Sequence, residues 1–305
     1  MNRRNFFLTS ASLGVSSAII GTVPENAHAE KIDKVSDAKL RLACYWGNFI
    51  PAENDDQRIK KMLAWGFQGV EISGNGNSTK GDLKKRLDDA GLEICSLCFG
   101  SCGGKIVSED VSRRQSGIDE LKKALENAGI LGAKCVVYVP AFNRQTKLEH
   151  LEIRKVLINT LPDLAKFAAQ HHTNIVLEPL NRGEAWFLRT IADAAAIARE
   201  CEKDHGGIGV LGDFYHMTTE ETSDMGAFLS GGSRLMHVHL GNGPQPPRRT
   251  LPGQDDRLFV DGFRGLKFLG YNRFCSFECG VHGDKEIEIP KSIAFLKSEW
   301  EKAEI

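Results

Sequence analysis

From residue 40 onward, short apolar runs alternate with longer segments in which apolar residues recur at helical spacing. The short runs are rich in Val, Ile, Leu and Cys, and glycine occurs in the turns between them. This alternation is typical of parallel βα units. It predicts eight strands, the number that closes a parallel barrel, at residues 40–45, 69–73, 93–99, 135–139, 174–178, 209–213, 235–240 and 274–278.

Several predicted helices end in an apolar stripe followed by glycine, which is the pattern of a helix C-cap. The clearest cases are Gly66, Gly91, Gly129 and Gly270, and we predict that these glycines are structural.

An open, doubly wound sheet would show the same alternation, but it would need a loop that binds phosphate. No GxGxxG follows the first predicted strand, and no GxxxxGK[ST] occurs in the chain. No linker or shift in composition follows residue 30. The sequence therefore predicts an α/β protein with one domain over residues 30–305, a (β/α)8 TIM barrel.

Composition narrows the class of protein. The 305 residues are 41% hydrophobic and 26% charged, with 39 Lys and Arg against 40 Asp and Glu. This near balance excludes a basic nucleic-acid scaffold and an acidic disordered tail. Most of the eight cysteines lie inside apolar runs, and Cys95-x-x-Cys98 has no second pair at zinc-ribbon spacing. We therefore expect core packing and no disulfide framework.

Residues 1–29 differ from the rest of the chain. Arg3 and Arg4 precede a mild apolar stretch, residues 13–23, that is diluted with Ser and Gly. This start resembles a twin-arginine export signal, and residues 27–29 (AHA) fit the small-x-small cleavage rule. We expect the twin-arginine export machinery to deliver a periplasmic protein; the alternative is a poorly ordered extension with two chance arginines. No other run approaches the roughly 20 apolar residues that span a bilayer, so no stable membrane span is expected after cleavage.

Polar residues end four predicted strands in succession, the fifth to the eighth. In a TIM barrel the chemistry lies where strands run into the following loops. One strand-end Asp or Glu is more often a helix N-cap or a surface charge, but four consecutive polar ends favour a metal site. Two Glu, one Asp and one His suit Mn²⁺, Mg²⁺ or Co²⁺, with Zn²⁺ possible. The polar residues are Glu178, Asp213, Glu278 and, on the seventh strand, His237 and His239, which share a strand face.

Four segments resemble the signature segments of the xylose isomerase-like TIM barrels. They are residues 177–184 (LEPLNRGE), 212–217 (GDFYHM), 237–241 (HVHLG) and 277–278 (FE). The resemblance is to the sugar isomerase/epimerase branch, which contains ketose 3-epimerases and hydroxypyruvate isomerases. It covers roughly residues 40–300.

The resemblance implies that Glu178, Asp213, His239 and Glu278 are metal ligands, and that the two glutamates are also the acid and base on opposite faces of the substrate. It further implies that Glu184, His216 and an arginine after the His-x-His strand bind the substrate. Arg248 and Arg249 are both candidates for that arginine. For His237 two roles remain open: it either hydrogen-bonds to a metal ligand without binding the metal, or it simply packs within the strand.

A proton next to a carbonyl is hard to move because the carbanion is unstable. An enzyme needs a base, a Lewis acid on the carbonyl oxygen and an acid that returns the proton. We therefore predict a divalent-metal-dependent isomerase or epimerase of a sugar or keto sugar, acting through a metal-stabilised enediolate. Because the loop at residues 241–247 is rich in proline and lacks a glycine-rich run, we expect an unphosphorylated substrate.

Two alternatives remain. A metal-dependent lyase on a keto sugar would use the same deprotonation, and a non-isomerising relative would only bind the sugar. Endonuclease IV-like DNA-repair enzymes share the barrel, but their three zinc ions need further histidines from strands three and four. Residues 95–101 and 136–142 contain none, and a net charge of −1 together with export argues against nucleic acid.

Overall fold

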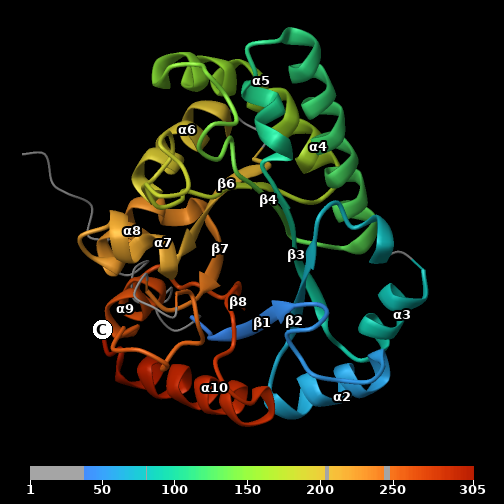
Figure 1. Ribbon diagram of the computed structural model, residues 1–305, viewed down its shortest axis with the longest axis vertical. Coiled ribbons are helices and arrows are strands. Elements are labelled where there is room, and N and C mark those ends of the chain that lie inside the picture. Colours follow the sequence, from blue (N-terminus) through green and yellow to red (C-terminus); the bar gives the residue numbers. More distant parts are fainter. Residues whose placement is uncertain (1–37, 80, 203–205, 244–247) are drawn as a thin grey trace, which may run out of the picture.

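The protein is described by a computed structural model that covers residues 38–79, 81–202, 206–243 and 248–305. Its strands are all parallel and close into a barrel in chain order, from β1 to β8, which confirms the predicted TIM barrel (Figure 1). Every predicted strand is present, and bounds differ from the prediction by at most one residue at an end. The strands are β1 (Arg41–Tyr45), β2 (Gly69–Ser73), β3 (Glu93–Gly100), β4 (Cys135–Tyr138), β5 (Ile175–Leu177), β6 (Ile208–Asp213), β7 (Leu235–Leu240) and β8 (Phe274–Phe277).

Helices surround the barrel as an outer layer (Figure 1). Short 3₁₀ turns, η2 (Asn77–Thr79), η3 (Cys102–Val107) and η4 (Gly232–Arg234), lie in the connections. The helices are α2 (Asp55–Trp65), α3 (Asp82–Asp89), α4 (Val111–Leu131), α5 (His150–Gln170), α6 (Ile191–Glu202), α7 (Phe214–Glu220), α8 (Asp224–Gly231), α9 (Val260–Phe268) and α10 (Lys285–Lys302).

Three of the four predicted C-cap glycines follow a helix with positive φ, namely Gly66, Gly91 and Gly270. The prediction for Gly129 is wrong, because α4 continues to Leu131 and ends at Gly132, whose φ is 73°. Gly129 has a different role. A Cβ there would lie 2.6 Å from the backbone oxygen of His171, so its missing side chain lets α4 approach the end of α5 closely.

Alternation along the strands divides the apolar residues between two layers. On β4 and β5, Val136 and Ile175 belong to the large cluster between the strands and the helices. Val137 and Val176 belong to a small cluster, with Cys135 and Leu211, that side-chain alternation places inside the barrel. A second small cluster, of Ala43, Cys95 and Phe274, comes from β1, β3 and β8.

The eight cysteines are free thiols, and five of them are buried, as expected for small hydrophobes. Among the described residues, no helix combines the length and apolar character needed to cross a bilayer. The predicted export signal, residues 1–29, and its boundary with the barrel domain lie outside the described residues.

Candidate metal centre

The carboxyl ends of β5 to β8 bring four predicted ligands to one level of the barrel. Asp213 and His239 are partners in the register of β6 and β7. Glu178 and Glu278 directly follow β5 and β8, and each backbone N–H still donates to the neighbouring strand at 3.1 Å. Because both residues continue the strand ladder, their side chains are fixed by the sheet and not by a loop.

One ligand atom from each of Glu178, Asp213, His239 and Glu278 lies within 4.8 Å of the others. His239 Nδ1 is 2.5 Å from Glu278 Oε2 and 3.2 Å from Glu178 Oε1. Glu178, Asp213 and His239 are 4%, 1% and 0% exposed. Three carboxylates and one imidazole, all but Glu278 withdrawn from water, form a donor set that fits a hard divalent cation.

The cluster holds more carboxylates than cationic side chains, and the pKa values of its members are shifted accordingly. Burial raises the pKa of Glu178, and its hydrogen bond with His239 offsets this only in part. Burial also opposes ionisation of Asp213, but Arg249, His216 and His239 together outweigh it and hold the pKa of that carboxyl below its ordinary value. Burial lowers the pKa of His239, but Glu278 and other carboxylates outweigh it and raise that pKa well above the ordinary value.

Asp213 is both a helix N-cap and a member of the candidate metal site. Its Oδ1 accepts from the backbone N–H of Tyr215 at 2.9 Å, so it is the N-cap of α7. Its Oδ2 faces the cluster, 2.5 Å from Arg249 Nη2. The cap holds the carboxylate in place while its other oxygen stays available for a cation.

Of the two candidate arginines, Arg249 reaches the cluster and Arg248 is exposed. The Arg249 guanidinium pairs with both Asp213 and Glu278, and its Nε donates to the backbone oxygen of Glu278 at 2.7 Å. It also lies over the Tyr215 ring, 4.9 Å from the centroid. The backbone of Arg249 is left-handed, with φ 49°, a conformation that side chains other than glycine rarely adopt.

His216 and Glu184, the other predicted substrate contacts, lie beside the cluster. His216 is 2% exposed, and its Nδ1 accepts from the backbone N–H of Asn181 at 3.1 Å. In the neutral ring the proton is therefore on Nε2, which is 3.4 Å from Asp213 Oδ2. The Glu184 side chain is 36% exposed, and its Oε1 lies 4.0 Å from His216 Nδ1. Glu184 thus lies at the rim, outside the set of ligand atoms.

Two residues from the first half of the barrel also reach the cluster, and the sequence analysis missed both. The hydroxyl of Tyr45, at the end of β1, donates to Glu278 Oε1 at 3.2 Å. Glu71 of β2 is fully buried and lies 3.2 Å from His239 Nε2 and 2.7 Å from His237 Nε2. Burial raises the pKa of Glu71, but the two histidines outweigh it and hold that pKa well below the ordinary value. Its sequence signal is slight, a lone glutamate inside an apolar strand.

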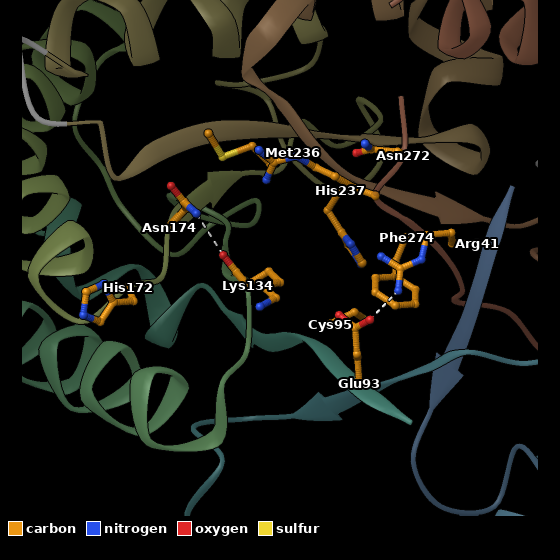
Figure 2. Close-up of a pocket in the computed structure, with 11 residues that line it drawn as sticks. Arg41, Glu93, Cys95, Lys134, His172, Asn174, Met236, His237, Asn272 and Phe274 are labelled. Atoms are coloured by element: carbon orange, nitrogen blue, oxygen red, sulfur yellow. Dashed lines mark hydrogen bonds and ion pairs between the residues drawn. The ribbon is translucent and has the colours of Figure 1, made fainter. Parts of the chain in front are cut away.

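A cavity of about 310 Å³ opens at the opposite, amino-terminal end of the strands. Figure 2 shows Arg41, Glu93 and Phe274 beside it, with the His237 ring at its wall. Arg41 pairs with Glu93 at 2.5 Å and lies over the Phe274 ring, 4.0 Å from the centroid. None of the four ligand residues lines this cavity. The cavity and the metal centre therefore lie at different ends of the barrel.

Comparison with known proteins identifies the family. Residues 59–299 match the family described as Xylose isomerase-like TIM barrel. The 3-dehydro-D-guloside 4-epimerase of Escherichia coli strain K12 is 28% identical over 263 residues, which are 82% of this chain and 96% of that protein. The D-psicose 3-epimerase of Enterocloster bolteae is 29% identical over 226 residues, 70% of this chain and 72% of that protein.

A solved structure gives the same result at the level of the fold. The apo form of 3-keto-D-glucoside 4-epimerase from E. coli superposes with a TM-score of 0.74 at 26% sequence identity, covering 85% of this chain and all of that one. The chain therefore belongs to the xylose isomerase-like TIM barrel family.

Proposed function

We propose that the protein is a divalent-metal-dependent isomerase or epimerase of a sugar or keto sugar. The observation that carries this is the set of three carboxylates and one imidazole within 4.8 Å at the carboxyl ends of β5 to β8, of which all but Glu278 are buried. The similar proteins named above are sugar epimerases, which supports epimerisation in particular. An isomerase and an epimerase differ only in which atom or face receives the proton.

Glu178, Asp213, His239 and Glu278 would hold the ion. Mn²⁺, Mg²⁺ and Co²⁺ suit these donors best, and Zn²⁺ fits the same set. When bound, the ion supplies a Lewis acid for the carbonyl oxygen. Its two positive charges, with that of Arg249, balance the three carboxylates. This balance explains why so much negative charge is tolerated at a buried site.

Glu178 and Glu278 are the proton-transfer pair in this proposal, and their environments differ. Both contact His239, but the Glu178 side chain is 6% exposed, whereas the Glu278 side chain is 22% exposed and also contacts Arg249 and Tyr45. Unequal environments suit a pair in which one group takes a proton as the other gives one.

Glu184, His216 and Arg249 would contact the oxygens of the substrate. His216 presents its Nε2 proton toward Asp213, and Arg249 presents a cation that a hydrogen bond to the backbone oxygen of Glu278 holds in place. Arg248 is exposed, so Arg249 is the better candidate of the two. We further propose that the substrate is unphosphorylated, because the loop after β7 lacks a glycine-rich run of backbone donors.

Product analysis tests the proposal. The metal-loaded protein is incubated with unphosphorylated ketoses and 3-keto sugars in D₂O. We expect one product of equal composition that carries deuterium on the carbon next to the carbonyl. Cleavage into two products would show that the protein is a lyase and not an isomerase. A large preference in kcat/KM for a phosphorylated sugar would contradict the proposed substrate class.

We also propose that residues 1–29 direct export to the periplasm, on the evidence of Arg3 and Arg4 before a mild apolar stretch. Cell fractionation of the wild type and of an Arg3→Lys, Arg4→Lys variant tests this. Export of the wild type and retention of the variant are expected. Equal distribution of the two forms would contradict the proposal.

A further inference from the structure

Beneath the four ligand residues, a second set of polar side chains fills part of the barrel interior. Glu71 of β2, Ser96 of β3 and His237 of β7 are all 0% or 1% exposed. Barrel interiors are normally packed with branched apolar residues, and a buried carboxylate costs free energy unless its partners compensate. Three polar residues in this layer therefore need a reason.

Glu71 holds the side of His239 that faces away from the ligand cluster. His239 directs Nδ1 toward Glu278 and Glu178, at 2.5 and 3.2 Å. Its Nε2 lies 3.2 and 3.3 Å from the two oxygens of Glu71. An ionised carboxylate only accepts hydrogen bonds, so Glu71 takes the proton of Nε2 and leaves the Nδ1 lone pair for a cation.

Glu71 is itself held from two sides. The Ser96 hydroxyl donates to Glu71 Oε2 at 2.6 Å, and His237 Nε2 lies 2.7 Å from the same oxygen. Glu71 and Ser96 are register partners of β2 and β3, so the sheet itself sets their contact. The rings of His237 and His239 stand nearly perpendicular, with an interplanar angle of 85°. Each ring can thus present a nitrogen to the same carboxylate.

We propose that Glu71, held by Ser96 and His237, is a positioning residue that fixes the tautomer and ring orientation of His239 so that Nδ1 is its metal donor. The inference rests on the proposed metal centre and adds residues from the first half of the barrel to it. Glu71 acts through His239 and is fully buried, so it does not touch the substrate.

A second cation is the competing interpretation of the same residues. One ligand atom each from Glu71, His237 and His239 also lies within 4.8 Å of the others. Hydrogen bonds from Ser96 and the two histidines already satisfy Glu71 without an ion. We therefore favour positioning, and the stoichiometry of the metal decides between the two.

The test is a Glu71→Gln variant, which keeps the size of the side chain and removes its charge. We expect the Kd for Co²⁺ to weaken about 10- to 100-fold. The visible absorption of bound Co²⁺ should also shift, because His239 is no longer held in one orientation. Glu93→Gln is the matched control: it makes the same substitution on the neighbouring strand, where Glu93 pairs with Arg41, and neither readout should change.

Nitrogen NMR of the Zn²⁺-loaded protein reads the tautomer directly. The wild type should show His239 with its proton on Nε2, and Glu71→Gln should show a mixture. Ser96→Ala removes one hydrogen bond to Glu71 and should give a smaller change in Kd and in the Co²⁺ spectrum. If Glu71→Gln does not fold, Ser96→Ala carries the test, and wild-type values for both readouts would overturn the inference.

Two further results would overturn it. One is a wild-type Kd and Co²⁺ spectrum in folded Glu71→Gln. The other is two metal ions per wild-type chain with one lost in Glu71→Gln, which would make Glu71 a ligand. Failure of the proposed function gives a different result. A wild type that binds no metal would contradict both the proposed function and this inference. One ion bound equally by the wild type and by Glu71→Gln would contradict only this inference.

Discussion

Charged side chains lie at both ends of the barrel, but they are buried at one end and exposed to water at the other. At the carboxyl end, Glu178 and Asp213 are 4% and 1% exposed and share their surroundings with other charges. At the amino end, the side chains of Arg41 and Glu93 keep 26% and 46% of their exposure and form a simple pair. Water screens such an exposed pair, which is typically worth about 0–1 kcal/mol.

The difference in burial indicates which end is functional. Withdrawing a carboxylate from water costs several kcal/mol before its partners compensate. A protein that gathers two buried carboxylates, Glu178 and Asp213, beside the partly exposed Glu278 gives up stability there, and the proposed cation would account for this. The cavity at the amino end is roomy, but the one carboxylate that lines it, Glu93, is partly exposed and pairs with Arg41. Burial of like charges, and not the volume of a cavity, therefore marks the site.

The largest expected effect is on turnover at the carboxyl end. Glu178→Gln and Glu278→Gln each keep one ligand oxygen but remove a basic carboxylate, so turnover should fall about 10²- to 10⁴-fold. Solvent deuterium incorporation next to the carbonyl of the substrate measures this, with metal content determined in parallel. Near-wild-type exchange in both variants, with metal bound, would leave the cluster as a binding site without catalysis.

The next effect concerns Arg249, which separates substrate binding from metal binding. Arg249→Met removes a cation that pairs with Asp213 and Glu278. We expect kcat/KM to fall about 30-fold or more, as for loss of a buried charged partner. The Kd for Mn²⁺ should not weaken, because a positive charge has left the neighbourhood of the ion. Weaker Mn²⁺ binding in this variant would instead make Arg249 part of the support of the metal centre.

A smaller effect is expected at the rim. The Glu184 side chain is 36% exposed, and it lies 4.0 Å from His216 Nδ1, outside the ligand set. Glu184→Gln should raise KM by about tenfold, the value of one hydrogen bond to a charged group, and leave kcat almost unchanged. Steady-state kinetics with the substrate identified by product analysis would show this. A fall in kcat with constant KM would move Glu184 into the proton-transfer machinery.

Features of the fold and of the candidate site could be predicted from the sequence where they depend on neighbouring residues, and not where they depend on contacts between distant ones. The eight strands and the polar residues at the ends of four of them are local patterns, so they could be read along the chain. The contact between Glu71 and His237 joins residues 166 positions apart, and only closure of the barrel brings them together. The choice between Arg248 and Arg249 depends on which side chain reaches Asp213 and Glu278, and the local sequence does not signal this.

The smallest expected effect lies at the amino end. Glu93→Gln breaks the pair with Arg41 but leaves Arg41 over the Phe274 ring and in contact with water. The free energy of unfolding should therefore change by about 1 kcal/mol or less. Turnover should not change at all, because the carboxylates of the metal centre lie at the other end of the strands. Thermal unfolding and deuterium exchange measured on the same preparation test both statements. A loss of turnover without a loss of stability would mean that the amino end communicates with the metal centre, and His237, which lines the cavity and contacts Glu71, would then be the residue to examine.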